Sequence, residues 1–171
     1  METTPRNFNT ALEKGEYGEQ IVRCILEEKG FIVYKPNTEG AHAFDILAIK
    51  DKSKCIAMDV KAKARRNKYA DTGINLKHYN VYKRFADKHS MDFWLIFVDE
   101  MLGSIYGNTL EKLNEPKKVD GIEYPYDSNK SIRYWPISSM IVIHQLNQKE
   151  RADLACLSQR SYNYELSGLS A

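Results

Sequence analysis

Residues 44–50 have the sequence FDILAIK, and residues 58–61, which follow after a short turn, include the sequence MDVK. Both runs are apolar and lie in segments of strand length, so they predict two adjacent antiparallel strands. Asp and Lys are disfavoured in strand interiors, and burying them is costly unless they are paired or bind a metal. Because side chains alternate along a strand, Asp59 and Lys61 point the same way, and Asp45 meets Asp59 across the pair.

This set of side chains is typical of a site for magnesium and phosphate chemistry. Mg²⁺ takes oxygen ligands and keeps several waters, so two or three carboxylates are enough to hold it. Asp45 and Asp59 supply two, and Glu19 supplies a third if the first predicted helix packs on the sheet. Lys61 is placed to orient an attacking water or to neutralise charge developing on a phosphate. The pattern therefore indicates cleavage of a phosphodiester.

Size and charge narrow the class of protein. The chain has 171 residues, of which 43% are hydrophobic and 28% charged, as is ordinary for one globular domain. The net charge is only +2 and identifies no partner. Positive charge is concentrated between Lys61 and Ser90, where nine Lys or Arg residues accompany two acids, Asp71 and Asp87. A basic segment beside a carboxylate site is expected of a protein that binds a polyanion.

Cysteine usage and the absence of membrane signals predict a cytoplasmic protein. The three cysteines are widely spaced and lack the Cys-x-x-Cys pattern of zinc or iron–sulfur sites. Cys24 and Cys55 lie in apolar patterns and are predicted to be buried thiols, which suits a reducing compartment. The N-terminal segment has no signal-peptide core, and the longest strongly apolar run is too short to span a membrane.

The periodicity predicts a mixed α/β sheet flanked by helices. A helix is predicted at residues 9–29, with Gly30 as its stop. Gly15 and Gly18 within it each cost about 1 kcal/mol relative to alanine, so a close approach to the helix backbone is expected there. Strands are predicted at residues 31–35, 44–50, 54–63, 92–98 and 104–106, with a loop at residues 65–73 and a second helix at residues 75–89.

The second half of the chain is less clearly patterned. The sequence predicts a helical turn at residues 109–113, a long loop with room for a small hairpin at residues 114–130, and an edge strand at residues 131–135. Residues 138–145 are compatible with either a helix or a strand, and the residues after Asn147 are predicted to form one helix and a tail. The aromatic residues of this half fit a core, a dimer surface or a platform for unpaired nucleotides, and the sequence does not choose among these.

Glu19, Phe44-Asp45 and Asp59-Val60-Lys61 resemble the motif of the PD-(D/E)XK, or restriction-endonuclease-like, nuclease superfamily. The element order agrees with the core of that superfamily. Small members that resemble archaeal Holliday junction resolvases are similar in having a glutamate on the first helix and a basic loop after the lysine. The resemblance implies a single nuclease domain, residues 1–171, with a core at residues 10–106 and a peripheral extension at residues 107–171.

By this resemblance, Asp45 and Asp59 bind the metal, Lys61 is the catalytic lysine, and Glu19 helps to bind the metal or its waters. The implied cofactor is Mg²⁺, for which Mn²⁺ can substitute, and the implied source is prokaryotic, archaeal or a phage. Two positions depart from the motif. Phe44 stands where the motif name has proline, and Asp59 stands where glutamate is more frequent, which shortens the reach to a metal by one methylene.

The basic loop and the second helix supply the predicted DNA contacts. Lys63 shares the face of Lys61, and residues 71–75 form a predicted loop-to-helix junction where Thr72 or Asn75 caps the helix and the helix amides hold a phosphate. Such contacts grip the backbone by charge and carry little sequence information. The predicted DNA-binding residues are Lys63, Arg65, Arg66, Lys68, Tyr69, Thr72 and Lys77.

Together these features predict a metal-dependent DNA endonuclease. No zinc finger or evident helix-turn-helix is present, which favours a structure-selective substrate such as branched, junction or nicked DNA. A homodimer is expected, because cutting two strands calls for two sites and C2 symmetry is the common arrangement. Two alternatives stay open: a non-catalytic module on the same fold that binds nucleic acid or protein, and a nuclease that acts on RNA or on free DNA ends.

Overall fold

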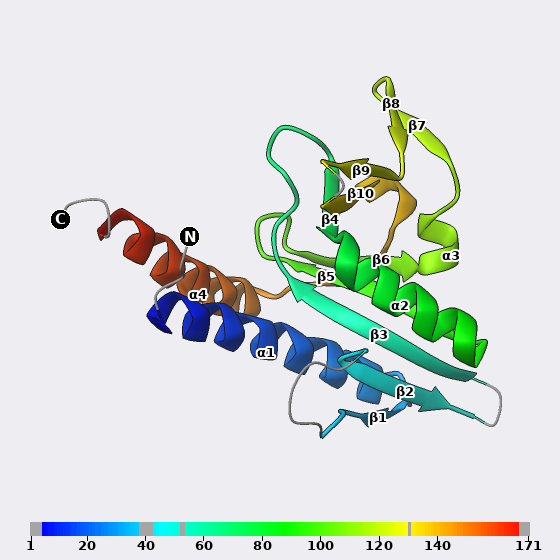
Figure 1. The fold of residues 1–171 in the computed structure, drawn as a ribbon. Helices are drawn as coiled ribbons and strands as arrows, with labels where there is room; N and C mark the ends of the chain where they lie inside the picture. The colour runs from blue at the N-terminus through cyan, green and yellow to red at the C-terminus, as the bar shows by residue number, and fades with distance from the viewer. Residues whose placement is uncertain (1–4, 38–42, 52–53, 130, 168–171) are drawn as a thin grey trace.

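The computed structural model describes residues 5–37, 43–51, 54–129 and 131–167. Its centre is a six-stranded mixed sheet flanked by helices, as predicted (Figure 1). Strands β3 and β5 run parallel, and the other neighbouring pairs of this sheet are antiparallel. The strands in spatial order are β1 (Ile32–Tyr34), β2 (Ile46–Lys50), β3 (Lys54–Ala62), β5 (Asp92–Asp99), β6 (Ser104–Thr109) and β11 (Ile141–Gln145).

Each face of this sheet has its own core, because the residues of the central strands alternate between the faces. Along β5, Ile96 packs with the cluster of helix α1 (Pro5–Glu28), and Leu95 packs with the cluster of helix α2 (Leu76–His89). Helix α4 (Gln148–Ser167) lies beside α1 (Figure 1). Along β3, Val60 belongs to the α1 cluster, whereas Asp59 contacts α2. The candidate site therefore lies on the α2 side of the sheet.

The glycines within α1 and just after it differ in backbone conformation and in how closely other atoms approach them. Gly30 has φ +83° and follows the last helical turn, so its predicted role as the stop is confirmed. A Cβ at Gly18 would lie 2.9 Å from the Cβ of Ala62, so the helix backbone approaches β3 closely there, as predicted. At Gly15 an added Cβ would meet no described atom within 4 Å, so the same prediction is wrong for Gly15.

A smaller three-stranded sheet stands beside α2 and is built from segments far apart in the sequence (Figure 1). Its order is β4 (Asp71–Asn75), β10 (Ile132–Pro136) and β9 (Tyr126–Ser128). Two predictions are wrong here. Residues 71–73 are strand rather than loop, and the segment predicted as an edge strand is the central one, because β10 pairs with both neighbours.

The remaining elements complete the second half of the chain. A short helix α3 (Leu110–Leu113) and a hairpin of β7 (Lys117–Val119) and β8 (Ile122–Tyr124) lie in the segments predicted as a helical turn and as a loop with a hairpin. The 3₁₀ turn η1 (Ile137–Ser139) leads into β11, so the choice left open for residues 138–145 falls largely to a strand, and α4 is the predicted terminal helix.

Two further observations concern the burial of the cysteines and the helices as candidate membrane spans. Cys24 is exposed and Cys55 is half-buried, so the prediction of buried thiols is wrong. Cys24 lies just outside the buried stripe formed by Ile21, Val22 and Ile25. Among the described residues, no helix has both the length and the apolar character needed to cross a membrane.

Candidate active site

Asp45 and Asp59 stand opposite each other where β2 begins. Ile46 pairs with Met58 in the β2–β3 ladder, and the Asp45 N–H donates to the Met58 carbonyl at 2.9 Å. One step along this antiparallel register places Asp45 across from Asp59, as predicted from the sequence. Asp59 is only 2% exposed, and Asp45 is partly buried. The two carboxylates therefore share one site with little access to water.

The proximity of these carboxylates changes the protonation of Asp45. Burial, followed by the charge of Asp59, raises the pKa of Asp45 to about 6. The charge of Lys61 and the Val60 N–H, which donates to Asp45 Oδ2 at 2.8 Å, act in the opposite direction. Two carboxylates this close repel when both are ionised, so in the absence of a cation Asp45 loses its proton at a higher pH than a free carboxyl does.

Asp59 is held by a lysine and a tyrosine. Lys61 Nζ lies 2.8 Å from Oδ1 and 2.7 Å from Oδ2, and the hydroxyl of Tyr82 donates to Oδ1 at 2.6 Å. Oδ2 is buried, and its close contact is the ion pair with the Lys61 ammonium. Burial and the charge of Asp59 raise the pKa of Tyr82, so its phenol stays neutral.

Tyr82 is a site residue that the sequence does not single out. Its place in the apolar stripe of α2 predicts a core residue, and its ring does stack on Phe93 with centroids 4.9 Å apart. The periodicity of a helix predicts which face is buried but not which atom a hydroxyl meets. That contact depends on how α2 lies across β3, which only the folded structure reveals.

Glu19 lies apart from the aspartate pair and binds a lysine. Its Oε2 is 2.8 Å from Lys35 Nζ, beside a hollow of about 330 Å³ that Ile46 also lines. The hydrogen bond to Glu19 is the main cause that raises the pKa of Lys35, and the charge of Asp45 contributes weakly. Within the described ranges, no group of three His, Cys, Asp or Glu side chains is placed to hold a metal. The structure thus brings Asp45 and Asp59 together and leaves Glu19 at their margin.

Two lysines of the loop after β3 differ in the contacts of their ammonium groups. Lys63 Nζ donates to the Gly73 carbonyl at 2.9 Å, and burial, followed by the charges of Lys61 and Arg66, lowers its pKa. Lys68 is exposed. Lys63 is exposed as well, but its ammonium is engaged by the Gly73 carbonyl and so fastens the loop to the smaller sheet.

Arg66 is occupied by structural contacts. Its guanidinium donates from Nε to Asp71 Oδ1 at 2.6 Å and from Nη2 to Asp71 Oδ2 and to the hydroxyl of Tyr126. It also stacks over Tyr134 at 3.9 Å and over Tyr69 at 4.6 Å. Asp71 is fully buried, and its hydrogen bonds raise the pKa of Arg66. Arg66 and Tyr69 thus anchor the loop, and 31% of the Arg66 side chain stays exposed.

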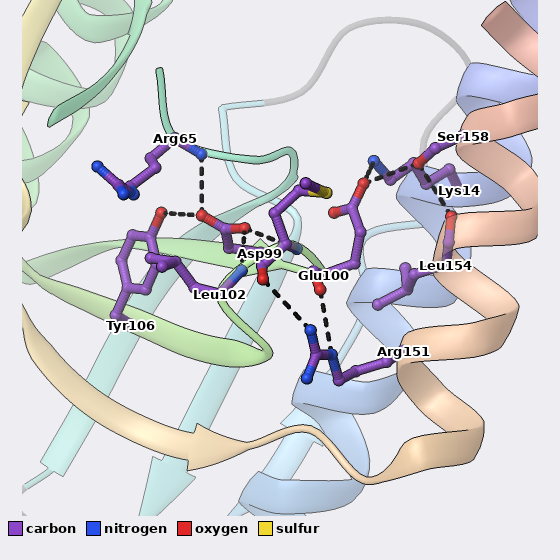
Figure 2. A network of polar contacts seen from close by, with 10 residues as sticks. Lys14, Arg65, Asp99, Glu100, Leu102, Tyr106, Arg151, Leu154 and Ser158 are labelled. Atoms are coloured by element: carbon purple, nitrogen blue, oxygen red, sulfur yellow. Dashed lines mark hydrogen bonds and ion pairs between the residues drawn. The ribbon is translucent and has the colours of Figure 1, made fainter. Parts of the chain in front are cut away.

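Asp99, at the end of β5, holds the main chain of the same loop (Figure 2). This fully buried carboxylate accepts from the Arg65 N–H at 2.9 Å and from the Tyr106 hydroxyl at 2.8 Å. It also accepts from the N–H groups of Met101 and Leu102, both at 3.0 Å, which closes the β5–β6 turn. The sequence marks Asp99 only as the start of a turn, and its contact with Arg65 is not visible there.

Glu100 ties the two helices of the opposite face to this turn (Figure 2). Its Oε1 accepts from Lys14 of α1 at 2.7 Å and from Ser158 of α4 at 2.8 Å. Burial acts to raise the pKa of Glu100, but the hydrogen bonds, chiefly that from Lys14, hold it below its usual value. The basic loop therefore rests on a frame that includes α1, α4 and the β5–β6 turn.

The start of α2 corrects one prediction. Thr72 lies in β4 at 1% exposure, so it neither caps the helix nor presents its hydroxyl to DNA. Asn75 is the cap, since its Oδ1 accepts from the Lys77 N–H at 2.8 Å. Lys77 is exposed. The His78 ring lies beside that of Tyr82, with centroids 6.3 Å apart, and burial, followed by the charges of Lys61 and Lys77, lowers the pKa of His78.

The oxygen donors of Asp45 and Asp59 fit a hard divalent cation. Mg²⁺ is commonly bound by one or two carboxylates together with waters and substrate phosphate oxygens. Asp59 Oδ2 is a buried anionic oxygen in contact with the partly exposed Lys61 ammonium, and a bound cation would favour the ionised form of Asp45, whose pKa burial and the charge of Asp59 raise to about 6. The pair therefore has the chemistry, though not a complete ligand set, for Mg²⁺ or Mn²⁺.

A scan against protein families and a search of curated proteins find no match to the chain. Among solved structures, the chain is similar to Hjc, a Holliday junction resolvase from Archaeoglobus fulgidus, with a TM-score of 0.50 and 14% identity over 74% of this chain and 86% of that one. A nuclease from a fusselovirus matches with a TM-score of 0.47 and 16% identity over 96% of this chain and 99% of that one. The mixed sheet with its flanking helices is therefore the restriction-endonuclease-like nuclease fold, as the sequence motif predicts.

Proposed function

We propose that the chain is a Mg²⁺-dependent endonuclease that hydrolyses phosphodiester bonds in DNA. The observation that carries this proposal is the assembly of Asp45, Asp59 and Lys61 around one partly enclosed site on β2 and β3. Two facing carboxylates with little water are unfavourable unless a cation offsets their charge, so their presence suggests a use. The fold shared with a Holliday junction resolvase supports the same reading.

Each residue then has a separate task. Asp45 and Asp59 would hold Mg²⁺ together, and Glu19, at the margin of the site, would orient waters of the cation. When bound, the cation supplies positive charge to the phosphate and lowers the pKa of a bound water. The Lys61 side chain is 30% exposed, so its ammonium can turn from Asp59 to a phosphate oxygen and offset the charge that develops there.

The surface around the site favours a substrate recognised by shape. Lys68, in the loop after β3, and Lys77, in the first turn of α2, are exposed and would contact phosphates rather than bases, together with the exposed parts of Lys63, Arg65 and Arg66. We therefore propose branched or junction DNA as the substrate. We also propose a homodimer, so that two sites act on two strands. Sedimentation equilibrium is expected to give twice the chain mass of 19.8 kDa.

A panel of labelled substrates tests the proposed reaction. It contains linear duplex, single strand, four-way junction, flap and closed circle, each incubated with Mg²⁺, Mn²⁺ or EDTA. We expect cleavage of the junction or flap with either metal, and none in EDTA. Asp59→Asn and Lys61→Ala are expected to lose at least about 100-fold in rate, the size of effect seen when one charge-stabilising group is removed.

The same panel separates the alternatives. A non-catalytic module would bind DNA in a salt-dependent way and cut nothing with either metal. An end-acting nuclease would spare the closed circle, and an enzyme specific for RNA would leave all five DNA substrates intact while cutting RNA versions of them.

A further inference from the structure

Tyr82 enters the candidate site from α2 and is fixed at both ends of its side chain. Its ring is 5% exposed and stacks on Phe93 at an interplanar angle of 13°. Its hydroxyl donates to Asp59 Oδ1 at 2.6 Å. A phenol held by stacking on one side and by a short hydrogen bond on the other has little freedom, so it restricts the rotation of the carboxylate that it contacts.

The two carboxylate oxygens of Asp59 consequently have different hydrogen-bond partners. Oδ1 accepts from Tyr82 at 2.6 Å and from Lys61 at 2.8 Å, whereas Oδ2 is buried and has the ion pair with the same Lys61 ammonium, at 2.7 Å, as its close contact. The adjacent carboxylate is also oriented, because Val60 N–H donates to Asp45 Oδ2. A rotation of the Asp59 carboxylate would bring Oδ2 to Tyr82 and expose Oδ1, so the hydroxyl decides which oxygen remains for another partner.

The chemical type of the donor matters as much as its position. A second cation on Oδ1 would cancel the charge of Asp59 and compete with a metal, whereas a neutral hydroxyl fixes the carboxylate without cancelling its charge. The Lys61 side chain is partly exposed, so its ammonium can move away from Asp59, whereas the buried Tyr82 side chain keeps its contact with Asp59. A buried carboxylate needs some donor merely to be stable, so the test below separates orientation from stability.

We infer that Tyr82 is a positioning residue that turns Asp59 Oδ2 toward a divalent cation held with Asp45. The inference rests on the proposed function and adds a residue from α2 to it. Tyr82 contributes to metal affinity through Asp59 and touches neither the metal nor the DNA. Its role accounts for a tyrosine, rather than a phenylalanine, at a position that packs as part of the core.

Binding of Mn²⁺ to the full chain, without DNA, measures this role directly by calorimetry or electron paramagnetic resonance. Tyr82→Phe keeps the ring and removes only the hydroxyl. We expect it to weaken Mn²⁺ binding about tenfold, as for loss of one hydrogen bond to a charged group. The matched control is Tyr79→Phe, one turn earlier on α2, where the buried hydroxyl accepts from Asn114 Nδ2 at 2.9 Å. That variant is expected to bind Mn²⁺ as the wild type does.

The outcomes distinguish the two proposals. If Asp59→Asn abolishes binding but Tyr82→Phe binds like the wild type, the role of Tyr82 is overturned and the proposed function stands. If the wild type binds no Mn²⁺, or Asp59→Asn binds it equally well, the proposed function fails and the inference fails with it. A fall in melting temperature without a change in Mn²⁺ affinity marks Tyr82 as structural only and also overturns the inference.

A second measurement uses the unmodified chain and does not depend on the folding of a variant. Tyrosines labelled with ¹³C at Cζ are observed by NMR during titration with diamagnetic Mg²⁺. We expect the Tyr82 resonance to move as the metal saturates and the Tyr79 resonance to stay. A Tyr82 resonance that is unchanged at saturating Mg²⁺ overturns the inference.

Discussion

The burial of Asp45 and Asp59 next to each other destabilises the folded protein when both carboxylates are ionised. Each carboxylate has hydrogen bonds that hold it in position, yet burial and, after it, the charge of Asp59 raise the pKa of Asp45 to about 6. A protein selected only for stability would not retain this pair, because an apolar or amide side chain would pack there at lower cost. A cation bound between the two carboxylates would offset this repulsion and so remove the loss of stability.

Stability without metal should therefore depend on pH through Asp45. The pKa of about 6 in the folded state exceeds the value of 3.8 for a free carboxyl, so the folded state binds the proton more tightly and loses stability as pH rises from about 4 to 6. Asp45→Asn is expected to raise the free energy of unfolding in EDTA by about 3 kcal/mol at pH 7.5, and not at pH 3.5. Urea unfolding at both pH values measures the difference. Asp87→Asn, at an exposed position, should change little, and an equal gain for Asp45→Asn at both pH values would contradict the explanation.

At the scale of elements, local patterns predict the central sheet well. The strands β2, β3 and β5 and the helices α1 and α2 follow their periodicities, and the pairing of Asp45 with Asp59 follows from the short hairpin between β2 and β3. The smaller sheet is different. Strand β4 pairs with β10, which lies far along the chain, and residues 71–75 have no alternation that signals a strand. The contacts of Tyr82 and Asp99 also join distant elements, so no local pattern predicts them.

The close contact between α1 and β3 gives a test with a built-in control. Gly18→Ala improves helix propensity but places a Cβ 2.9 Å from the Cβ of Ala62, so we expect a net loss of about 1–2 kcal/mol in the free energy of unfolding. Gly15→Ala meets no described atom within 4 Å and should gain up to about 1 kcal/mol. Urea unfolding of both variants gives the comparison, and the same gain at both positions would show that the helix does not pack so closely on β3.

The hold of Asp99 on the basic loop is testable by proteolysis. Asp99→Ala removes the acceptor for the Arg65 N–H and for the Tyr106 hydroxyl, leaving buried donors unpaired at a cost of about 3 kcal/mol or more. We expect trypsin to cut the loop of residues 63–70 faster in this variant. Tyr106→Phe removes one of these partners and leaves the Arg65 contact, so it serves as the control. If both variants are cut at the wild-type rate, Asp99 does not fasten the loop.

At the scale of the whole molecule, charge is distributed unevenly over a nearly neutral chain. The net charge is +2, yet exposed Lys68 belongs to the loop that follows Lys61 and exposed Lys77 to the first turn of α2, while Lys54 lies at the other end of β3, about 23 Å from Lys61 along the strand. DNA that lies over the site would meet the first two lysines and not the third. The whole-molecule arrangement therefore predicts one binding face.

Fluorescence anisotropy with a four-way junction at several salt concentrations measures the DNA affinity of this face and its dependence on salt. Lys68→Ala and Lys77→Ala are each expected to weaken binding and to reduce the slope of log affinity against log salt by about 1, as for one lost phosphate contact. Lys54→Ala should leave affinity and slope unchanged. Equal effects at all three positions would indicate binding by general charge rather than by a face around the site.

The rate of cleavage of a labelled four-way junction under single-turnover conditions in Mg²⁺ tests the central claim most directly. Wild type, Asp59→Asn, Lys61→Ala and the control Lys54→Ala are compared at protein concentrations that saturate the DNA. A metal-dependent nuclease centred on Asp45, Asp59 and Lys61 predicts cleavage by the wild type and by Lys54→Ala, with a loss of at least about 100-fold in the two site variants while they still bind the junction. Absence of cleavage by the wild type in both Mg²⁺ and Mn²⁺, or equal rates in all four proteins, would contradict it.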